Sequence, residues 1–159
     1  MSNVEDINAD DLRDLYRELI LDHAKKPRHF GKLDAATHTA QGINPLCGDK
    51  LHLYLQLDDA GKICDAKFEG SGCAISVASA SLLTDSVIGL DKSDALHRFE
   101  EVTSSLTRNP DVAAVNVDLG KLRALEGVRQ YPARVKCATL AWHALHSAIS
   151  QHTAPVKTE

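Results

Sequence analysis

Three cysteines, Cys47, Cys73 and Cys137, carry the clearest chemical signal in this sequence. Each lies where a thiolate would be exposed and stabilised: after a proline turn, after a glycine-rich turn that opens a helix, and at the start of the last helix. Together with Asp49, the three thiols make four anionic ligands, which is the number that a tetrahedral zinc site needs. If these four side chains converge in the fold, the sequence predicts a metal site rich in sulfur.

Cys47 and Asp49 are separated by Gly48 alone, and glycine permits the unusual backbone angles that would let both side chains face one ion. On spacing alone, a surface loop with an unrelated cysteine and a turn-forming aspartate fits these residues at least as well. No two cysteines of the chain show the C-x-x-C spacing of structural zinc modules. Spacing therefore leaves both interpretations open.

Cys73 follows Gly70 and Gly72, which would let the backbone approach whatever the sulfur holds. The free N–H groups and positive dipole end of a helix N-terminus stabilise a thiolate. A buried cysteine that acts as a small hydrophobic residue is an equal alternative at this position.

Cys137 has two cationic neighbours, Arg134 and Lys136, and nearby cations lower the pKa of a thiol. They would also offset the negative charge of three thiolates and a carboxylate around one Zn²⁺. Alone, Cys137 fits a structural role as well as a chemical one.

Two other groups of residues are given structural roles. Cys64 shares a predicted strand face with Ala66 and Phe68, and we therefore expect it in the core rather than at a metal. His143 and His146 lie one helical turn apart and could form a metal-binding face. They flank a predicted buried stripe, which favours partial exposure instead.

The bulk composition narrows the class of protein. The chain of 159 residues fits one domain, expected to span residues 1–159 with its ordered part at roughly 10–150. A net charge of -4 with both signs mixed argues against a nucleic-acid-binding surface. The sequence has no membrane-length apolar run and no secretory start. We therefore expect a cytoplasmic protein whose thiols stay reduced and act as ligands or nucleophiles.

Hydrophobic periodicity predicts an α+β fold, a small antiparallel β-sheet with helices packed on one face. Leucines at alternate positions predict a half-buried strand over residues 49–58. The chain ends, 1–8 and 151–159, are expected to be loose. The remaining predicted strands cover 37–41 and 62–69, and the helices cover about 10–26, 73–89, 93–107, a short segment after residue 118, and 132–149.

Four segments in the right order resemble the SufU branch of the IscU/NifU N-terminal family of iron–sulfur cluster assembly proteins. The resemblance covers roughly residues 10–150 and implies the same α+β fold. It also implies that Cys47, Asp49, Cys73 and Cys137 are the metal ligands. The segments are Leu15-Tyr16 through His23 to Pro27, NPLCGD at 44–49, FEGSGCAIS at 68–76 and RVKCATLAW at 134–142.

Three departures from scaffold-type IscU proteins favour the SufU branch. Lys136 replaces the histidine that precedes the last cysteine in those proteins. The chaperone-recognition motif upstream is lost, since residues 130–134 read QYPAR. Residues 91–127 resemble the SufU insertion.

The resemblance implies a zinc-bound partner of a SufS-like cysteine desulfurase, which makes a persulfide with pyridoxal phosphate. Cys47 would accept the sulfane sulfur, which makes the chain a zinc-dependent sulfurtransferase, an activator of the desulfurase that passes sulfur to downstream SUF assembly machinery. Two alternatives remain. One is a scaffold that assembles a transient [2Fe–2S] cluster on the same ligands, and the other is a structural zinc domain that mediates protein contacts.

Overall fold

The computed structural model describes residues 9–107, 120–129, 131–151 and 154–158. Sequence-based predictions for residues 1–8 and for Asp118 lie outside this part. The elements are, in chain order, α1 (Ala9–Lys25), β1 (His38–Asn44), β2 (Asp49–Leu57), β3 (Ile63–Ser71), α2 (Ala74–Val87), α3 (Lys92–Thr107), the 3-10 helix η2 (Gly120–Val128), α4 (Pro132–Ile149) and β4 (Val156–Lys157).

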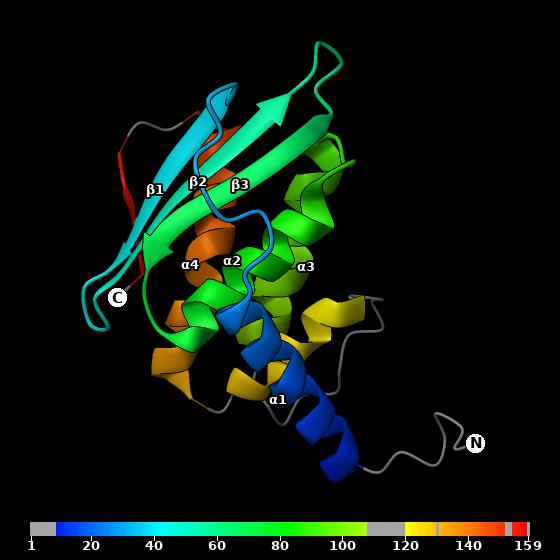
Figure 1. Cartoon of the computed structure of the whole chain (residues 1–159), viewed down its shortest axis with the longest axis vertical. Helices are drawn as coiled ribbons and strands as arrows, with labels where there is room; N and C mark the ends of the chain where they lie inside the picture. Colours follow the sequence, from blue (N-terminus) through cyan, green and yellow to red (C-terminus); the bar gives the residue numbers. More distant parts are fainter. Residues whose placement is uncertain (1–8, 108–119, 130, 152–153, 159) are drawn as a thin grey trace.

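Four strands form one sheet in the order β3-β2-β1-β4. The β1–β2 and β2–β3 pairs are antiparallel, as predicted, whereas β4 pairs in parallel with β1 and makes the sheet mixed. Within the described residues 154–158, the expectation of a loose tail is therefore wrong. The α+β fold class is confirmed, because α2 and α4 pack on the sheet while α1 and α3 pack on those two helices (Figure 1).

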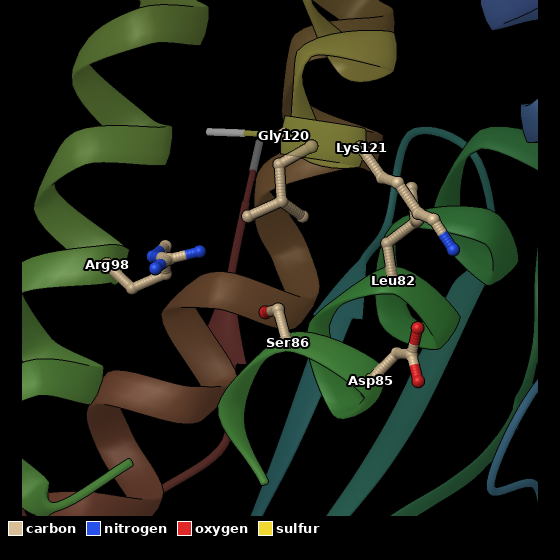
Figure 2. A pocket seen from close by; sticks show the side chains of 7 residues that line it. Leu82, Asp85, Ser86, Arg98, Gly120 and Lys121 are labelled. Carbon is tan, nitrogen blue, oxygen red and sulfur yellow. The ribbon is translucent and has the colours of Figure 1, made fainter. Parts of the chain in front are cut away.

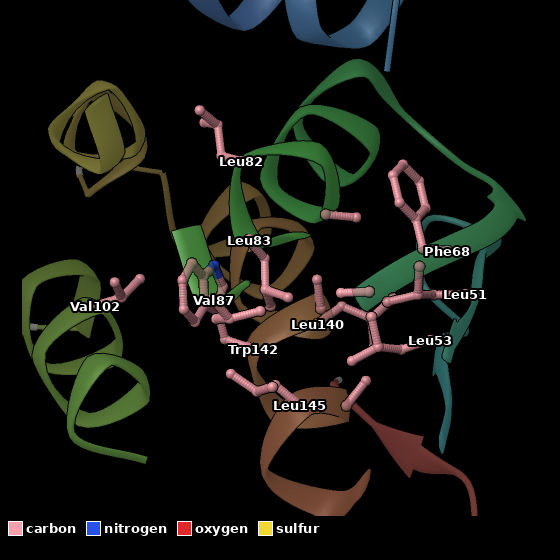
Figure 3. Close-up of a cluster of buried hydrophobic side chains, with 14 of the residues drawn as sticks. Leu51, Leu53, Phe68, Leu82, Leu83, Val87, Val102, Leu140, Trp142 and Leu145 are labelled. Carbon is pink, nitrogen blue, oxygen red and sulfur yellow. The ribbon is translucent and has the colours of Figure 1, made fainter. Parts of the chain in front are cut away.

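The core lies between the sheet and the helices (Figure 3). The alternate leucines of β2, such as Leu53 and Leu55, are fully buried, which confirms the predicted half-buried strand. From the helix side, Trp142 is fully buried, and its Nε1–H donates to Ser79 Oγ at 3.1 Å. Burial of this large side chain, with its one polar atom satisfied, holds α4 against α2.

Helix α2 is buried on more sides than its sequence suggests. Besides apolar side chains such as Leu82 and Leu83, the hydroxyl residues Ser79, Ser81 and Thr84 are also fully buried. Each of the three hydroxyls has a hydrogen-bond partner, so burial leaves no polar atom of theirs unpaired. The small side chains let α1, α4 and β3 approach the helix together.

Cys64 is exposed, so the prediction that places it in the core is wrong. Leu57 pairs with Ile63 and Gln56 pairs with Asp65, which leaves Cys64 as the extra residue of a β-bulge. The bulge breaks the two-residue alternation, so Ile63 takes the buried position that alternation assigned to Cys64. No helix in the described residues has the length and apolar character needed to cross a membrane.

Candidate metal centre

Three separate parts of the fold bring thiols to one end of β2. Cys47 lies in the four-residue loop of the β1–β2 hairpin, and Asp49 is the first residue of β2. Cys73 is the N-cap of α2, two residues after the end of β3. Cys137 lies in the second turn of α4, one turn later than the sequence suggested.

The ligand atoms of Cys47, Asp49 and Cys137 all lie within 4.8 Å of one another. The two sulfur atoms of Cys47 and Cys137 are 3.4 Å apart, and Cys73 Sγ lies 4.0 Å from Asp49 Oδ2. Two sulfur ligands of a tetrahedral zinc ion are about 3.8 Å apart, given Zn–S bonds of about 2.3 Å. Cys47, Asp49 and Cys137 therefore have a spacing that one ion can bridge, and Cys73 lies beside this group through its contact with Asp49.

Local backbone geometry holds this arrangement in place. Gly48 has a φ of 71°, the conformation expected for the residue between the first two ligands. Asp49 is fully buried, and its Oδ1 accepts the Cys73 backbone N–H at 2.9 Å. A Cβ at Gly72 would lie only 2.5 Å from that same Oδ1, and one at Gly70 would overlap the backbone of Lys50. The glycines thus permit the close approach between the start of α2 and the start of β2.

The three thiols have different surroundings. Cys47 is exposed, Cys73 is half-buried and Cys137 is only 2% exposed. Cys73 Sγ accepts the Ser76 backbone N–H at 3.4 Å, as expected for a helix N-cap. Thus only one of the three sulfurs, and not all three as the sequence suggested, is fully accessible.

Burial raises the pKa of the Cys137 thiol, and hydrogen bonding to its neighbours Asp49, Cys47 and Cys73 raises it further. The expectation that nearby cations lower this pKa is therefore wrong in this structure. Arg134 is exposed and its guanidinium lies 5.0 Å from the centre of the Tyr131 ring. A bound cation would reverse the effect of burial, because a coordinating thiol is deprotonated outright.

The sequence motif contained one site residue to which no role was assigned. Asn44 is fully buried, and its Nδ2 donates to Cys137 Sγ at 3.6 Å. A polar residue at the end of a strand, immediately before a proline turn, is the signal that could have identified it.

Two other features that could take part in chemistry, a pair of histidines and a cavity, lie outside the thiol cluster. His143 and His146 are both half-buried, as expected, and pack against the ring of Phe99. A concavity with a volume of about 360 Å³ is lined by residues of α2, α3 and η2, among them Asp85, Arg98 and Lys121 (Figure 2). Asp85 is about 18 Å along α2 from Cys73, so this cavity is separate from the thiols.

Comparison with known proteins identifies the family. Residues 15–138 match the family described as NifU-like N terminal domain, and this range contains all four residues of the thiol and carboxylate cluster. The chain belongs to that family. It is a member of the SufU- and IscU-type proteins of iron–sulfur cluster assembly, as its motifs predicted.

The family includes relatives that are named for different functions. The chain is 43% identical over 138 residues to the zinc-dependent sulfurtransferase SufU of Bacillus subtilis (strain 168), covering 86% of this chain and 90% of the relative. It is 42% identical over 145 residues to the iron–sulfur cluster assembly scaffold protein IscU of Thermotoga maritima, covering 89% and 96%. Identity alone therefore does not separate a sulfurtransferase from a scaffold.

Solved structures share the fold. A protein named as a candidate scaffold for iron–sulfur cluster assembly in the SUF system of Fervidobacterium islandicum AW-1 matches with a TM-score of 0.76 and 36% identity, covering 83% of this chain and 94% of that one. The N-terminal part of a NifU-like protein from Brucella abortus matches with a TM-score of 0.75 and 26% identity, covering 88% and 95%.

Proposed function

We propose that this protein is a zinc-dependent sulfurtransferase of iron–sulfur cluster biogenesis in the cytoplasm. Its Cys47 accepts sulfur from the persulfide of a SufS-like cysteine desulfurase and passes it to downstream SUF machinery. The observation that carries this proposal is the unequal environment of the three clustered thiols. One sulfur is accessible and, among the residues that the structure describes, receives no hydrogen bond from nitrogen.

Cys73 Sγ accepts an N–H from Ser76, and Cys137 Sγ accepts one from Asn44. An N–H donor withdraws electron density from sulfur and lowers its nucleophilicity. Among the described residues, no nitrogen atom donates to Cys47 Sγ, and Cys47 is the exposed thiol of the set. Access and nucleophilicity therefore both favour Cys47 as the acceptor.

The donor set fits zinc. Three thiols and one carboxylate match the soft sulfur ligands and the coordination number of Zn²⁺, and the ligand atoms of Cys47, Asp49 and Cys137 lie within 4.8 Å of one another. Cys47, Asp49, Cys73 and Cys137 would hold the ion. When bound, zinc keeps thiols deprotonated without redox activity of its own.

The transfer step is a thiol–persulfide exchange. The Cys47 thiolate attacks the terminal sulfur of the donor persulfide, and a new S–S bond forms at Cys47. The donor S–S bond breaks, its electron pair leaves on the donor cysteine as a thiolate, and the S–H proton stays with the transferred sulfur. The exchange needs no external oxidant or reductant, because one thiolate and one persulfide are consumed and one of each is formed.

Asp49 supports this exchange as the hard oxygen ligand of a soft set. Its Oδ1 already accepts the Cys73 N–H, so the carboxylate stays at the centre of the cluster when Cys47 moves. We propose that Asp49 keeps the site labile.

Lys136 weighs against the scaffold alternative. It occupies the position of a histidine in scaffold-type proteins, and a protonated ammonium cannot ligate iron as an imidazole can. The IscU-named relatives nevertheless make a [2Fe–2S] scaffold the alternative that an experiment must exclude.

The test measures bound metal and desulfurase stimulation in the same preparations. We expect one zinc per chain and faster cysteine desulfuration by a cognate desulfurase, which Cys47→Ala abolishes. Cys64→Ala is the matched control, because Cys64 is also exposed but lies outside the cluster. A coloured, iron-containing protein that transfers a cluster to an apo-ferredoxin would support the scaffold instead, and zinc without stimulation would support a structural domain.

A further inference from the structure

Asn44 connects two of the proposed ligands. It is the last residue of β1, it pairs with Asp49 across the β1–β2 hairpin, and its side chain is fully buried. A buried amide is stable only when its polar atoms are hydrogen-bonded. The partners of this amide therefore show what the residue does.

The acceptor atoms of Asn44 fasten the loop that carries Cys47. Its Oδ1 accepts the Leu46 backbone N–H at 3.2 Å, and its backbone carbonyl accepts the Cys47 N–H at 3.3 Å. Such a bond to the backbone two residues ahead is the usual way that asparagine stabilises a turn. Because a backbone N–H can only donate, the contact with Leu46 identifies the oxygen of the amide.

The amide nitrogen then has a different partner. With Oδ1 directed at Leu46, Nδ2 faces Cys137 Sγ on α4, 3.6 Å away. One side chain thus contacts the loop of the accessible thiol and the sulfur of the buried thiol.

We infer that Asn44 is a positioning residue that makes Cys137 the sulfur that stays on the metal and Cys47 the sulfur that exchanges. Its N–H stabilises negative charge on Cys137 Sγ, which lowers the tendency of this sulfur to react while it remains a ligand. Its two acceptor contacts hold the Cys47 loop beside the same metal without contacting Cys47 Sγ. The assignment of Cys47 as the exchanging sulfur rests on the proposed function, whereas the effect on the metal site does not.

Two substitutions separate the sulfur contact from the turn. In Asn44→Ser, the hydroxyl can still accept the Leu46 N–H, as serine does in turns, but it is too short to reach Cys137 Sγ. Asn44→Ala removes both contacts. Gln41→Ser is the matched control, since Gln41 is an exposed amide on the same strand.

The first readout uses Co²⁺ in place of zinc. Loss of an N–H···S bond raises the energy of the sulfur lone pairs, so the thiolate-to-cobalt charge-transfer band should move to longer wavelength in both Asn44 variants. Zinc affinity, measured against a chromophoric chelator, should fall about 10- to 100-fold, the usual effect of losing a group that orients a ligand. Gln41→Ser should match the parent in both measurements.

The second readout is the position of alkylation in the zinc-loaded protein, mapped by mass spectrometry after limited reagent. Burial protects Cys137 in every variant, so only the change between variants counts. Without the amide, the modified share of Cys137 relative to Cys47 should rise about 2- to 10-fold, the factor for one ordinary hydrogen bond.

Each alternative outcome overturns the inference. A parental charge-transfer band and affinity in Asn44→Ser would show that the sulfur contact has no effect, and a change confined to Asn44→Ala would assign the residue to the turn alone. If both variants fail to fold, Asn44→Asp, which keeps the shape and the Leu46 contact, is measured in the same way and judged by the band position. These readouts need no desulfurase, so the proposed sulfur transfer can fail while the Asn44 result stands, and the reverse.

Discussion

Strand β2 has a cysteine beside each of its ends, and the two ends differ in what surrounds that cysteine. Before β2, Cys47 is joined by Asp49, by Cys73 from the start of α2 and by Cys137 from α4. After β2, the bulged Cys64 is exposed, and its Sγ donates to the Gln56 carbonyl at 3.3 Å. A candidate metal site thus forms only where helices bring further donors to a hairpin, and an exposed thiol alone does not provide one.

The largest expected difference between the two ends is in metal content. Cys137→Ser should remove the central buried thiol and reduce bound zinc from about one per chain to a small fraction, because structural zinc sites need all four ligands. Cys64→Ser should leave the zinc content unchanged. Metal analysis after gel filtration, with circular dichroism to confirm folding, measures both. Equal zinc loss in the two variants would contradict the assignment of the zinc site to the Cys47 end of β2.

Asp49 and Asp58 provide a second contrast, because each accepts backbone N–H groups at opposite ends of β2. Asp49→Ala should weaken zinc binding, alter sulfur acceptance and lower the free energy of unfolding by about 1–3 kcal/mol, since the Cys73 N–H loses its partner. The fold should survive. Asp58 lies in an exposed turn, so Asp58→Ala should cost about 1 kcal/mol or less and leave zinc unaffected. Full activity and unchanged zinc affinity in Asp49→Ala would show that Asp49 is not a ligand.

A steric substitution tests the close approach directly. In Gly72→Ala the new methyl group would meet the Asp49 carboxylate, whereas a Cβ at Gly127 has no atom within 4 Å. We expect Gly72→Ala to weaken zinc binding by about 10-fold, by displacing a ligand and its hydrogen bond. Gly127→Ala should bind zinc as the parent does. A chelator competition assay compares them, and identical affinities would contradict the contact.

The smallest expected effect lies at the α1–α2 contact, away from both hairpins of β2. His23 is buried with its Nδ1 2.7 Å from Ser81 Oγ, and burial, followed by the charge of Arg28, lowers its pKa below 6.5. As the pH falls below 6.5 the unfolded chain takes up the proton first, so stability should decline until the pH reaches the lower pKa of the folded protein.

Denaturant unfolding of the parent and of His23→Gln measures this effect. The unfolding is followed at several pH values between about 4 and 7, a range that spans the ordinary histidine pKa of about 6.5. The decline should be shallower in His23→Gln, and zinc content at neutral pH should be equal in the two proteins. Parallel stability curves would show that another group causes the pH dependence.

The sequence predicted the elements that position the site with little error, because its signals there are local. Alternate leucines marked β2, Pro27 follows the end of α1 at Lys25, and glycines marked the approach to Cys73. The family motifs then selected which cysteines to group. Spacing could not do so, since the four residues lie on separate elements.

The features that the sequence predicted wrongly, or did not predict, depend on tertiary contacts. The β-bulge that exposes Cys64 follows from pairing with β2, and β4 forms only because residues 156–157 reach the edge of β1. The burial of Cys137 and its contact with Asn44 depend on where α4 packs against the β1–β2 hairpin. No property of a single segment reveals such contacts, and they decide how the three thiols differ.

The most direct test of the account is to locate the transferred sulfur. The zinc-loaded protein is incubated with a cognate cysteine desulfurase and cysteine, its free thiols are blocked, and each cysteine-containing peptide is weighed by mass spectrometry. We predict one additional sulfur atom on the peptide that contains Cys47, and none on those that contain Cys64, Cys73 or Cys137. Sulfur on Cys73 or Cys137 instead, or no transfer to a protein that carries its zinc, would contradict it.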